Sequence, residues 1–273
     1  MTTVPQIPLN DGRTIPQFGL GVWQMSPEDC LAATKHALSV GYRHIDTAAA
    51  YRNEEQVGRA IAESGLDRDE IFVTTKLWND RHTDAPAALD ESLAKLGLDR
   101  VDLYLIHWPV PSRNKYVDAW RSLIKLRDAG KATSIGVSNF TEEHLLRIID
   151  ATGVVPAVNQ IELHPSFARF DEIQIHKTHG IATEAWSPLG QGQDIETDIV
   201  VSIADEIGRT PSQVVLRWHI QRGVIVFPKS VTPSRIEENI DIFDFELTDA
   251  HMRRMHELNN KNRIGPDPRT LGA

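Results

Sequence analysis

Residues 72–108 read FVTTKLWNDRHTDAPAALDESLAKLGLDRVDLYLIHW, and they hold two apolar runs on either side of an amphipathic stretch. The runs at 72–77 and 102–108 are apolar without alternation, which is typical of parallel strands covered on both faces. Between them, residues 84–97 show helical periodicity and end at Gly97, a residue that favours the turn after a helix. The stretch therefore predicts a parallel strand, a crossover helix and a second parallel strand.

The same alternation continues along the rest of the chain. Polar residues close successive strand-like runs at steps of about 30 residues, as Asp46, Lys76 and His107 illustrate. Strands are predicted at 44–48, 72–77, 102–108, 133–139, 157–163, 182–188 and 224–230, and an eighth at 241–247. Helices are predicted at 27–41, 84–97, 117–130, 141–153 and 210–223.

These repeats predict an α/β fold, a (β/α)8 TIM barrel formed by a single domain over residues 1–273. A doubly wound open sheet is the alternative, but its first strand normally leads into a Gly-rich turn, and HIDTAAAYRNEE (44–55) contains no glycine. The opening segment, 4–21, is typical of a β-hairpin with Asp11-Gly12 at its turn, and we expect it at the barrel floor. In such a barrel the carboxyl ends of the strands carry the active site.

The bulk composition argues against several classes of protein. With 41% hydrophobic and 25% charged residues, the chain is ordinary for a soluble globular protein. Its formal net charge of −9 argues against a nucleic-acid partner, because phosphate backbones select basic surfaces. We find no apolar run near 20 residues and no signal peptide, so no membrane association is expected. The single cysteine, Cys30, suits the reducing cytoplasm.

Four polar side chains lie at or just beyond the ends of three successive strand-like runs: Asp46, Tyr51, Lys76 and His107. Burying such groups without partners costs several kcal/mol each, so we expect them to act together. A phenol has a pKa of about 10, which a neighbouring ammonium lowers, and a buried carboxylate keeps that ammonium charged. With a neutral histidine as hydrogen-bond donor, the four groups suit protonation of a carbonyl oxygen during reduction.

Each of these residues also has a simpler explanation. An Asp–Lys pair is often structural, and a histidine at a strand end is often a hydrogen-bonded core residue. The combination of all four favours catalysis. A second enzymatic interpretation makes Lys76 the amine nucleophile of a Schiff-base lyase. The Asp46 partner argues against it, because a paired lysine stays protonated and is a poor nucleophile.

Two further groups of residues suggest ligand contacts. Four tryptophans near the same strand ends suit a wall for a substrate or a flat cofactor ring: Trp23, Trp78, Trp108 and Trp186. Two cations and a hydroxyl follow the seventh predicted strand, where barrels commonly bind phosphate: Lys229, Ser230 and Arg235. A solvated basic turn is the alternative, but in a chain of net charge −9 we expect a phosphorylated ligand.

A metal centre is not predicted. The histidines are scattered, and the sequence has no HExxH motif, no cysteine pair and no Walker-type loop. His176 and His179, in HKTH (176–179), are expected on the surface of a helix.

Three segments resemble the signatures of the aldo-keto reductase family: GYRHIDTAAAYRNEEQVG (41–58), KATSIGVSNF (131–140) and VFPKSVTPSR (226–235). The resemblance covers essentially the whole chain. Further stretches are most similar to the prokaryotic branch that contains diketogluconate reductases: TTKLWND (74–80), VPAVNQIELHP (155–165) and SPLGQG (187–192). The resemblance implies a (β/α)8 barrel, NADPH as cofactor, a small-molecule aldehyde or ketone as substrate, and a monomer.

The resemblance also implies a role for individual residues. Tyr51 would donate the proton, Lys76 and Asp46 would adjust the acidity of Tyr51, and His107 would orient the carbonyl group of the substrate. Implied cofactor contacts, beginning with the carboxamide and ring of the nicotinamide, are Ser138, Asn139, Gln160, Trp186, Gly21, Val22, Thr47, Ser187, Leu189, Gln191, Lys229, Ser230, Val231, Arg235, Glu238 and Asn239. Implied substrate contacts are Trp23, Ala50, Trp78, His107 and Trp108.

Two features leave the substrate open. Ala49 and Ala50 make one wall of the pocket small, and the tail 260–273 has no aromatic residue, although the family often closes its pocket with this segment. Arg263 and Arg269 in that tail suggest anionic carbonyl substrates. A third interpretation of the chain is a regulatory subunit that binds NADPH with little turnover, as some relatives of the family do.

Overall fold

Eight parallel strands form one sheet in the computed structural model, which describes residues 4–271. They follow one another in chain order around the sheet: β3 (Leu20–Gly21), β4 (His44–Asp46), β5 (Phe72–Leu77), β6 (Val101–Ile106), β7 (Ala132–Ser138), β8 (Val158–Glu162), β9 (Ala182–Trp186) and β10 (Ile225–Val226). The ends of the predicted single domain, 1–3 and 272–273, lie outside the described residues.

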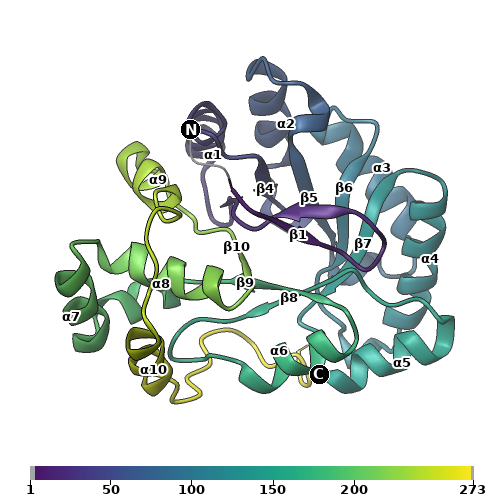
Figure 1. Ribbon diagram of the computed structural model, residues 1–273. Coiled ribbons are helices and arrows are strands. Elements are labelled where there is room, and N and C mark those ends of the chain that lie inside the picture. The colour runs from purple at the N-terminus through teal and green to yellow at the C-terminus, as the bar shows by residue number, and fades with distance from the viewer. Residues whose placement is uncertain (1–3, 272–273) are drawn as a thin grey trace.

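Helices cover the outside of this sheet (Figure 1). They are α1 (Pro27–Ser39), α2 (Glu54–Glu63), α3 (Ala85–Leu96), α4 (Tyr116–Asp128), α5 (Glu142–Thr152), α6 (Phe170–Thr178), α7 (Asp198–Ile207), α8 (Pro211–Gln221), α9 (Pro233–Ile240) and α10 (Asp249–Glu257). The five predicted helices are confirmed, and local signals explain their ends. Ser26 Oγ accepts a hydrogen bond from Asp29 N at the start of α1, and Gly97, with φ of 65°, follows the end of α3.

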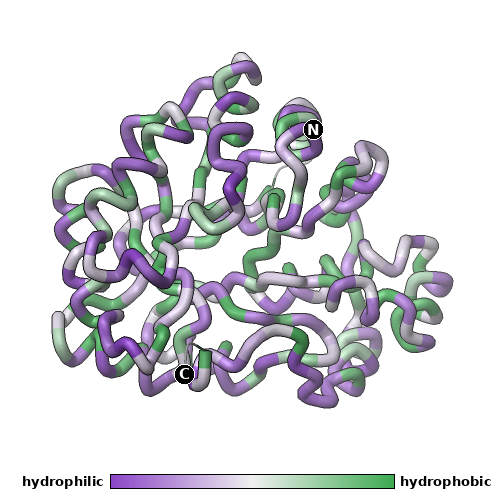
Figure 2. Tube along the Cα trace, turned by 180° about the vertical axis from the view of Figure 1, so that it is seen from behind, coloured by the Kyte–Doolittle hydropathy of each residue, from purple (hydrophilic) through white to green (hydrophobic). Residues whose placement is uncertain are grey.

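Several of the outer helices, α2 and α5 among them, are amphipathic. Hydrophilic and hydrophobic residues alternate along them (Figure 2), as expected when one face packs on the strands and the other meets water. Within residues 4–271 no helix is long and apolar enough to cross a membrane.

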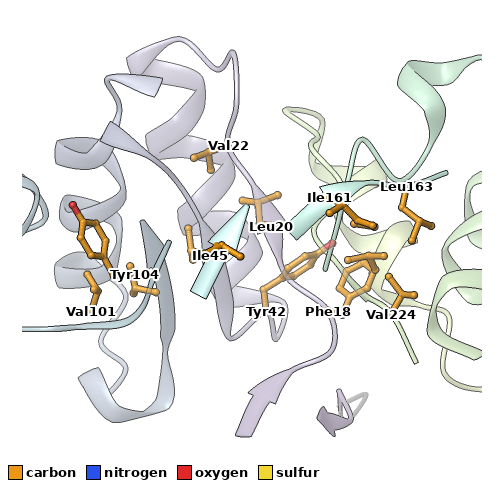
Figure 3. Packing of buried hydrophobic residues seen from close by; sticks show 14 of the residues in the cluster. Phe18, Leu20, Val22, Tyr42, Ile45, Val101, Tyr104, Ile161, Leu163 and Val224 are labelled. Atoms are coloured by element: carbon orange, nitrogen blue, oxygen red, sulfur yellow. The ribbon is translucent and has the colours of Figure 1, made fainter. Parts of the chain in front are cut away.

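The barrel closes between its last strand and its first. Phe18 forms a parallel bridge with Val226, Gly19 N donates to Val226 O at 2.8 Å, and Val226 N donates to Gln17 O at 3.1 Å. The rings of Phe18 and Tyr42 pack beside this seam with their centroids 5.5 Å apart (Figure 3). The predicted (β/α)8 barrel is confirmed, and the doubly wound alternative is wrong.

The eighth strand is not where the sequence predicted it. Residues 241–247 form neither helix nor strand, and the eighth strand is β3, which we expected to be part of the hairpin. Side chains of α8 donate hydrogen bonds to carbonyl oxygens of 241–247, from Gln213, Arg217 and Gln221. The segment is therefore held against helix α8, and two of its apolar residues, Ile242 and Leu247, are buried outside the sheet.

The predicted hairpin is confirmed as β1 (Gln6–Pro8) and β2 (Thr14–Pro16), which pair antiparallel. Gly12 has φ of 82° in the turn, a conformation that favours glycine. Two hairpin residues, Leu9 and Ile15, pack in one cluster with residues of the barrel strands, among them Val158 and Ile225, the first residues of β8 and β10. The hairpin thus covers the amino ends of the strands and leaves the carboxyl ends open.

Replacing Gly21 by Ala should weaken the closure of the barrel. A Cβ atom at Gly21 would lie 2.6 Å from the carbonyl oxygen of Phe227, and a backbone atom cannot move aside cheaply. Overpacking of this kind costs about 1–3 kcal/mol, so we expect the free energy of unfolding in urea to fall by that amount. An unchanged unfolding midpoint would show that the seam is loose.

Candidate active site

The four predicted catalytic side chains converge at the carboxyl end of the barrel. Asp46 ends β4, Lys76 lies in β5, His107 follows β6, and Tyr51 ends the short 3-10 helix η1 (Ala49–Tyr51). Lys76 Nζ donates to Asp46 Oδ1 at 2.7 Å and to Thr47 O at 2.8 Å, and it lies 3.4 Å from the Tyr51 hydroxyl. The Tyr51 and His107 rings meet edge to face with centroids 5.7 Å apart. The predicted juxtaposition of a phenol, an ammonium, a carboxylate and an imidazole is therefore present in the structure.

Burial and charge set the protonation states of this cluster. Burial works against the Lys76 ammonium, but Asp46 and Tyr51 outweigh it and raise the pKa of Lys76, so the lysine stays charged. Burial and the Lys76 charge together hold the pKa of His107 well below 6.5, so its imidazole is neutral. Both states agree with the expectation from sequence.

The net direction of the tyrosine pKa was predicted wrongly. Lys76 does lower the pKa of Tyr51, but burial of the phenolate has the larger effect, and the net pKa is raised above its ordinary value of 10. A sequence does not show how much water a phenolate loses on folding. At neutral pH Tyr51 therefore holds its proton, as a proton donor must.

A second set of hydrogen bonds fixes the residues beside this cluster. Asn139, with φ of 64°, donates through Nδ2 to His107 O and to Ser138 Oγ, both at 3.0 Å, and accepts at Oδ1 from Trp186 Nε1 at 2.8 Å. Ser138 Oγ in turn donates to the backbone carbonyl of Gln160 at 2.9 Å. Four residues predicted to contact a nicotinamide are thus linked into one rigid wall.

Three residues of this wall, Asn139, Gln160 and Trp186, form part of the lining of a cavity of about 850 Å³ at the carboxyl ends of the strands. Most of the predicted catalytic and ligand-binding residues line it: Gly21, Trp23, Asp46, Ala50, Tyr51, Trp78, His107, Trp108, Asn139, Gln160, Trp186, Ser187, Gln191 and Lys229. The other predicted residues do not line it, namely Val22, Thr47, Lys76, Ser138, Leu189, Ser230, Val231, Arg235, Glu238 and Asn239. Of these, Lys76 lies directly beneath the lining, bonded to Asp46, and Ser138 lies beside it, bonded to Gln160.

The predicted phosphate-binding residues lie around the start of α9. Lys229 and Arg235 are exposed, and Ser230 is buried, with its Oγ accepting from Thr232 N at 3.2 Å. At the other end of α9, Glu238 accepts from Thr210 Oγ1 at 2.8 Å, and Asn239 is buried. The basic residues therefore surround a helix amino terminus, while Glu238 and Asn239 lie one turn or more away.

One positioning residue was missed from the sequence. Asn53 is buried, donates from Nδ2 to Val22 O at 2.8 Å and accepts at Oδ1 from Thr47 Oγ1 at 2.8 Å. It ties the end of β3 to the segment that carries Tyr51. Asn53 directly precedes the helix α2, but its side chain makes no capping hydrogen bond there.

The C-terminal tail contributes to the cavity lining, although its sequence has no aromatic residue that would have predicted this. Ile264, Gly265 and Pro266 line the cavity, and the backbone N–H groups of Ile264 and Gly265 donate to the two carboxylate oxygens of Glu162. A Cβ atom at Gly265 would lie 2.3 Å from the Trp186 ring, so only glycine fits there without movement. The tail closes one side of the pocket without an aromatic residue.

Neither tail arginine faces the cavity. The Arg263 guanidinium stacks 4.8 Å above the Phe167 ring, and Arg269 pairs with Asp267 at 2.8 Å. The suggestion that Arg263 and Arg269 receive an anionic substrate is therefore not supported, because both guanidinium groups are engaged elsewhere.

A buried histidine connects the tail anchor to the loop after β9. His164 lies between Glu162, with Nε2 to Oε1 at 3.2 Å, and Asp194, with Nδ1 to Oδ2 at 2.9 Å. Burial opposes the imidazolium, but the hydrogen bonds of Asp194 and Glu162 outweigh it and raise the pKa of His164. Burial likewise opposes the two carboxylates, but the hydrogen bonds and charge of His164 act together with the N–H groups of Ile264 and Gly265 on Glu162, and with Ser166 on Asp194. Together they outweigh burial and lower the pKa of each carboxylate.

This cluster predicts a dependence of stability on pH. Because its folded pKa is raised, the contribution of His164 is complete below the ordinary value of 6.5 and is lost as pH rises through the folded pKa. The carboxylate contributions are complete above the ordinary values of 4.5 and 3.8 and are lost as pH falls. We expect the free energy of unfolding to decline above pH 6.5 and this decline to become shallower in His164→Gln. Identical slopes in the two proteins would contradict the assignment.

We had expected His176 on the surface of a helix, and this prediction is wrong. It is buried and forms hydrogen-bond contacts with Asn159 Nδ2 at 2.9 Å and Thr183 Oγ1 at 2.8 Å. Helical spacing alone does not show which face of α6 meets the sheet. Across residues 4–271 no group of three or more His, Cys, Asp or Glu side chains is placed to hold a metal ion.

Comparison with known proteins identifies the family. Residues 16–193 and 195–260 match the model of the Aldo/keto reductase family. The chain is 57% identical to an aldo-keto reductase of Mycolicibacterium smegmatis and 51% identical to the methylglyoxal reductase DkgA of Escherichia coli strain K12, in each case over 269 residues and 98% of both chains. A crystal structure of a Gox0644 mutant in complex with NADPH has a TM-score of 0.95 and 46% identity, covering 99% of each chain. The chain belongs to the aldo/keto reductase family.

Proposed function

We propose that this protein reduces small aldehydes and ketones to alcohols with NADPH. The observation that carries the proposal is the buried line of contacts from Asp46 through Lys76 to the Tyr51 hydroxyl, at the base of the cavity of about 850 Å³. Two relatives support the same chemistry, a methylglyoxal reductase and a protein crystallised with NADPH.

The catalytic residues would act on the carbonyl oxygen. NADPH, when bound, supplies a hydride to the carbonyl carbon. The Tyr51 hydroxyl donates its proton to the carbonyl oxygen, and the Lys76 ammonium stabilises the phenolate that remains. Asp46 keeps Lys76 charged, and the neutral imidazole of His107 orients the oxygen by a hydrogen bond.

The same geometry disfavours a Schiff-base lyase. An amine nucleophile must lose its proton. Burial favours loss of the Lys76 proton, but Asp46 and Tyr51 outweigh burial, so the pKa of Lys76 is raised. Lys76 is also fully buried, so a substrate carbonyl has no direct approach to Nζ.

The residues present fit NADPH. Lys229 and Arg235 are exposed beside the start of α9, and among residues 4–271 neither side chain has an acidic partner. Two free cations near a helix amino terminus suit a 2′-phosphate, with Ser230 and Val231 between them. Four other groups of residues would contact the cofactor. They are the nicotinamide wall (Ser138, Asn139, Gln160 and Trp186), the ends of β3 and β4 (Gly21, Val22 and Thr47), the pyrophosphate path (Ser187, Leu189 and Gln191) and the adenine contacts (Glu238 and Asn239).

The cofactor assignment has a direct test. Changing Lys229 and Arg235 together to Ala should raise KM for NADPH by about 10–100-fold, because charge-assisted hydrogen bonds to a phosphate are lost. KM for NADH, which lacks that phosphate, should change much less. Arg253→Ala, on α10, is a matched loss of an exposed cation that should leave both values unchanged. Equal effects on NADPH and NADH would contradict the assignment.

The substrate we propose is a small, neutral carbonyl compound, which would contact Trp23, Ala50, Trp78, His107 and Trp108. Ala49 and Ala50 line one side of the cavity, and Ile264, Gly265 and Pro266 narrow another, whereas both tail arginines face elsewhere. NADPH consumption should be measured with methylglyoxal, aromatic aldehydes, aldoses and keto acids, and the small neutral aldehydes should be used best. Tight NADPH binding with no oxidation across the panel would favour the regulatory subunit instead.

We also propose that the protein acts as a monomeric single domain in the cytoplasm. Its lone cysteine, Cys30, is buried and unpaired, which suits a reducing compartment. Light scattering coupled to size-exclusion chromatography should give the mass of one chain, and a mass of twice 30.6 kDa would contradict the monomer.

A further inference from the structure

A buried carboxyl group beneath the cavity has no place in the chemistry described above. Glu184, on β9, is fully buried and pairs in register with Gln160 on β8. It does not line the cavity, whereas Gln160 and Asp46 do. Glu184 therefore stands next to a residue of the cavity wall without facing the cavity itself.

Glu184 and Asp46 share one nitrogen atom. Gln160 Nε2 donates to Asp46 Oδ2 at 2.9 Å and to Glu184 Oε2 at 2.8 Å. An atom placed between two carboxyl oxygens, one of them on an ionised Asp, must be the donor end of the amide. Both hydrogens of the amide nitrogen are thus used, and the plane and direction of the side chain are fixed.

The other end of the amide is left free. No hydrogen bond from residues 4–271 reaches Gln160 Oε1, and this atom is not shut off from the cavity that Gln160 lines. A carbonyl oxygen accepts and cannot donate. The ligand group that suits it is therefore a hydrogen-bond donor, such as the N–H of an amide.

We propose that Glu184 is a positioning residue for the cofactor, which orients Gln160 so that Oε1 accepts a hydrogen bond from the carboxamide N–H of the nicotinamide. The inference rests on the proposed placement of the nicotinamide against Gln160. Burial and the Asp46 charge raise the pKa of Glu184 to about 8, so at neutral pH it accepts without adding a second negative charge beside Lys76. Its own Oε1 is buried without a partner, which packing alone would not favour.

Binding of two oxidised cofactors to the purified full chain tests the proposal without turnover. NADP⁺ carries the carboxamide N–H, whereas its 3-acetylpyridine analogue has a methyl group in that place. The ratio of the two dissociation constants, measured by titration calorimetry, reports the hydrogen bond to Gln160 Oε1. Gln160→Met should weaken NADP⁺ binding about tenfold and leave the analogue nearly unchanged.

Glu184→Met, which removes the acceptor at similar volume, should shift the ratio in the same direction by about three- to tenfold. Glu184→Gln, which keeps an acceptor, should restore the wild-type ratio. Thr183→Val is the matched control, because it removes a buried hydrogen bond to His176 on the other face of β9. If the ratio is shifted in Gln160→Met but normal in Glu184→Met, the role of Glu184 is overturned and the placement of the nicotinamide stands. If the ratio is normal in both variants, the placement of the nicotinamide against Gln160 is overturned as well.

A measurement on the wild-type protein covers the case in which Glu184→Met does not fold. Both side-chain N–H protons of Gln160 should be shifted downfield in the NMR spectrum and protected from exchange, because each donates to a buried carboxyl group. The resonances are assigned by their loss in Gln160→Met. One exposed, rapidly exchanging proton would overturn the proposal.

Discussion

Tyr51→Phe should lower kcat by about 10²–10⁴-fold while the dissociation constant for NADPH stays within a factor of two or so. The substitution removes one oxygen atom, which lies 3.4 Å from Lys76 Nζ, and leaves the ring that packs against His107. The raised pKa of Tyr51 keeps its proton in place at neutral pH, so the hydroxyl is available as the proton donor. The other groups of the cluster are less suited to donate a proton. His107 is neutral, and Lys76 is held by Asp46.

The chain offers a matched control for this substitution. Tyr104 is buried on β6, and its hydroxyl has no hydrogen-bond partner among residues 4–271. Tyr104→Phe therefore removes the same atom from a tyrosine outside the site and should leave kcat unchanged. Steady-state rates of NADPH consumption and fluorescence titrations with NADPH separate the two effects. Near-normal turnover in Tyr51→Phe would remove the basis of the proposed mechanism.

The sequence predicted the barrel because the information is local and repeated. A run such as 72–77 and the helix that follows it are recognisable within about 30 residues, and caps such as Ser26 mark their boundaries. Strand β3 escaped because it is two residues long and contains Gly21, so it has neither the length nor the side chains of a typical strand. Its pairing with β4 and its closure against β10 are long-range contacts that no local pattern encodes.

The site shows the same division. Position at a strand end was enough to bring Asp46, Lys76 and His107 together, because the fold itself aligns strand ends. The roles of Glu162 and Glu184 were missed because they depend on partners far away in the chain, the tail at Ile264 in one case and Asp46 in the other. The net pKa of Tyr51 depends on burial, which is a property of the folded molecule.

Lys76→Met should lower the free energy of unfolding by about 3–5 kcal/mol and abolish most of the activity. The Lys76 and Asp46 side chains are 0% and 3% exposed, so removing the ammonium leaves Asp46 as a buried carboxylate with its main counter-charge gone. Within residues 4–271, the Asp46 carboxylate would then keep a single hydrogen bond, the one from Gln160 Nε2. Lys35→Met is the control, because Lys35 pairs with Glu63 at the same kind of distance, 2.8 Å, but both side chains are exposed. For Lys35→Met we expect the free energy of unfolding to fall by about 0–1 kcal/mol.

A double variant separates the structural effect from the chemical one. In Lys76→Met with Asp46→Asn no buried charge is left unpaired, so much of the lost stability should return, and the coupling energy of the cycle should reach at least about 1 kcal/mol. Activity should not return, because the ammonium that stabilises the Tyr51 phenolate is absent in both variants. Urea unfolding and NADPH consumption measured on the same four proteins give both quantities. If the losses of stability in the two single variants simply add up in the double variant, the interaction between Lys76 and Asp46 contributes little to the free energy of unfolding. If turnover recovers in the double variant, the ammonium is not part of the proton transfer.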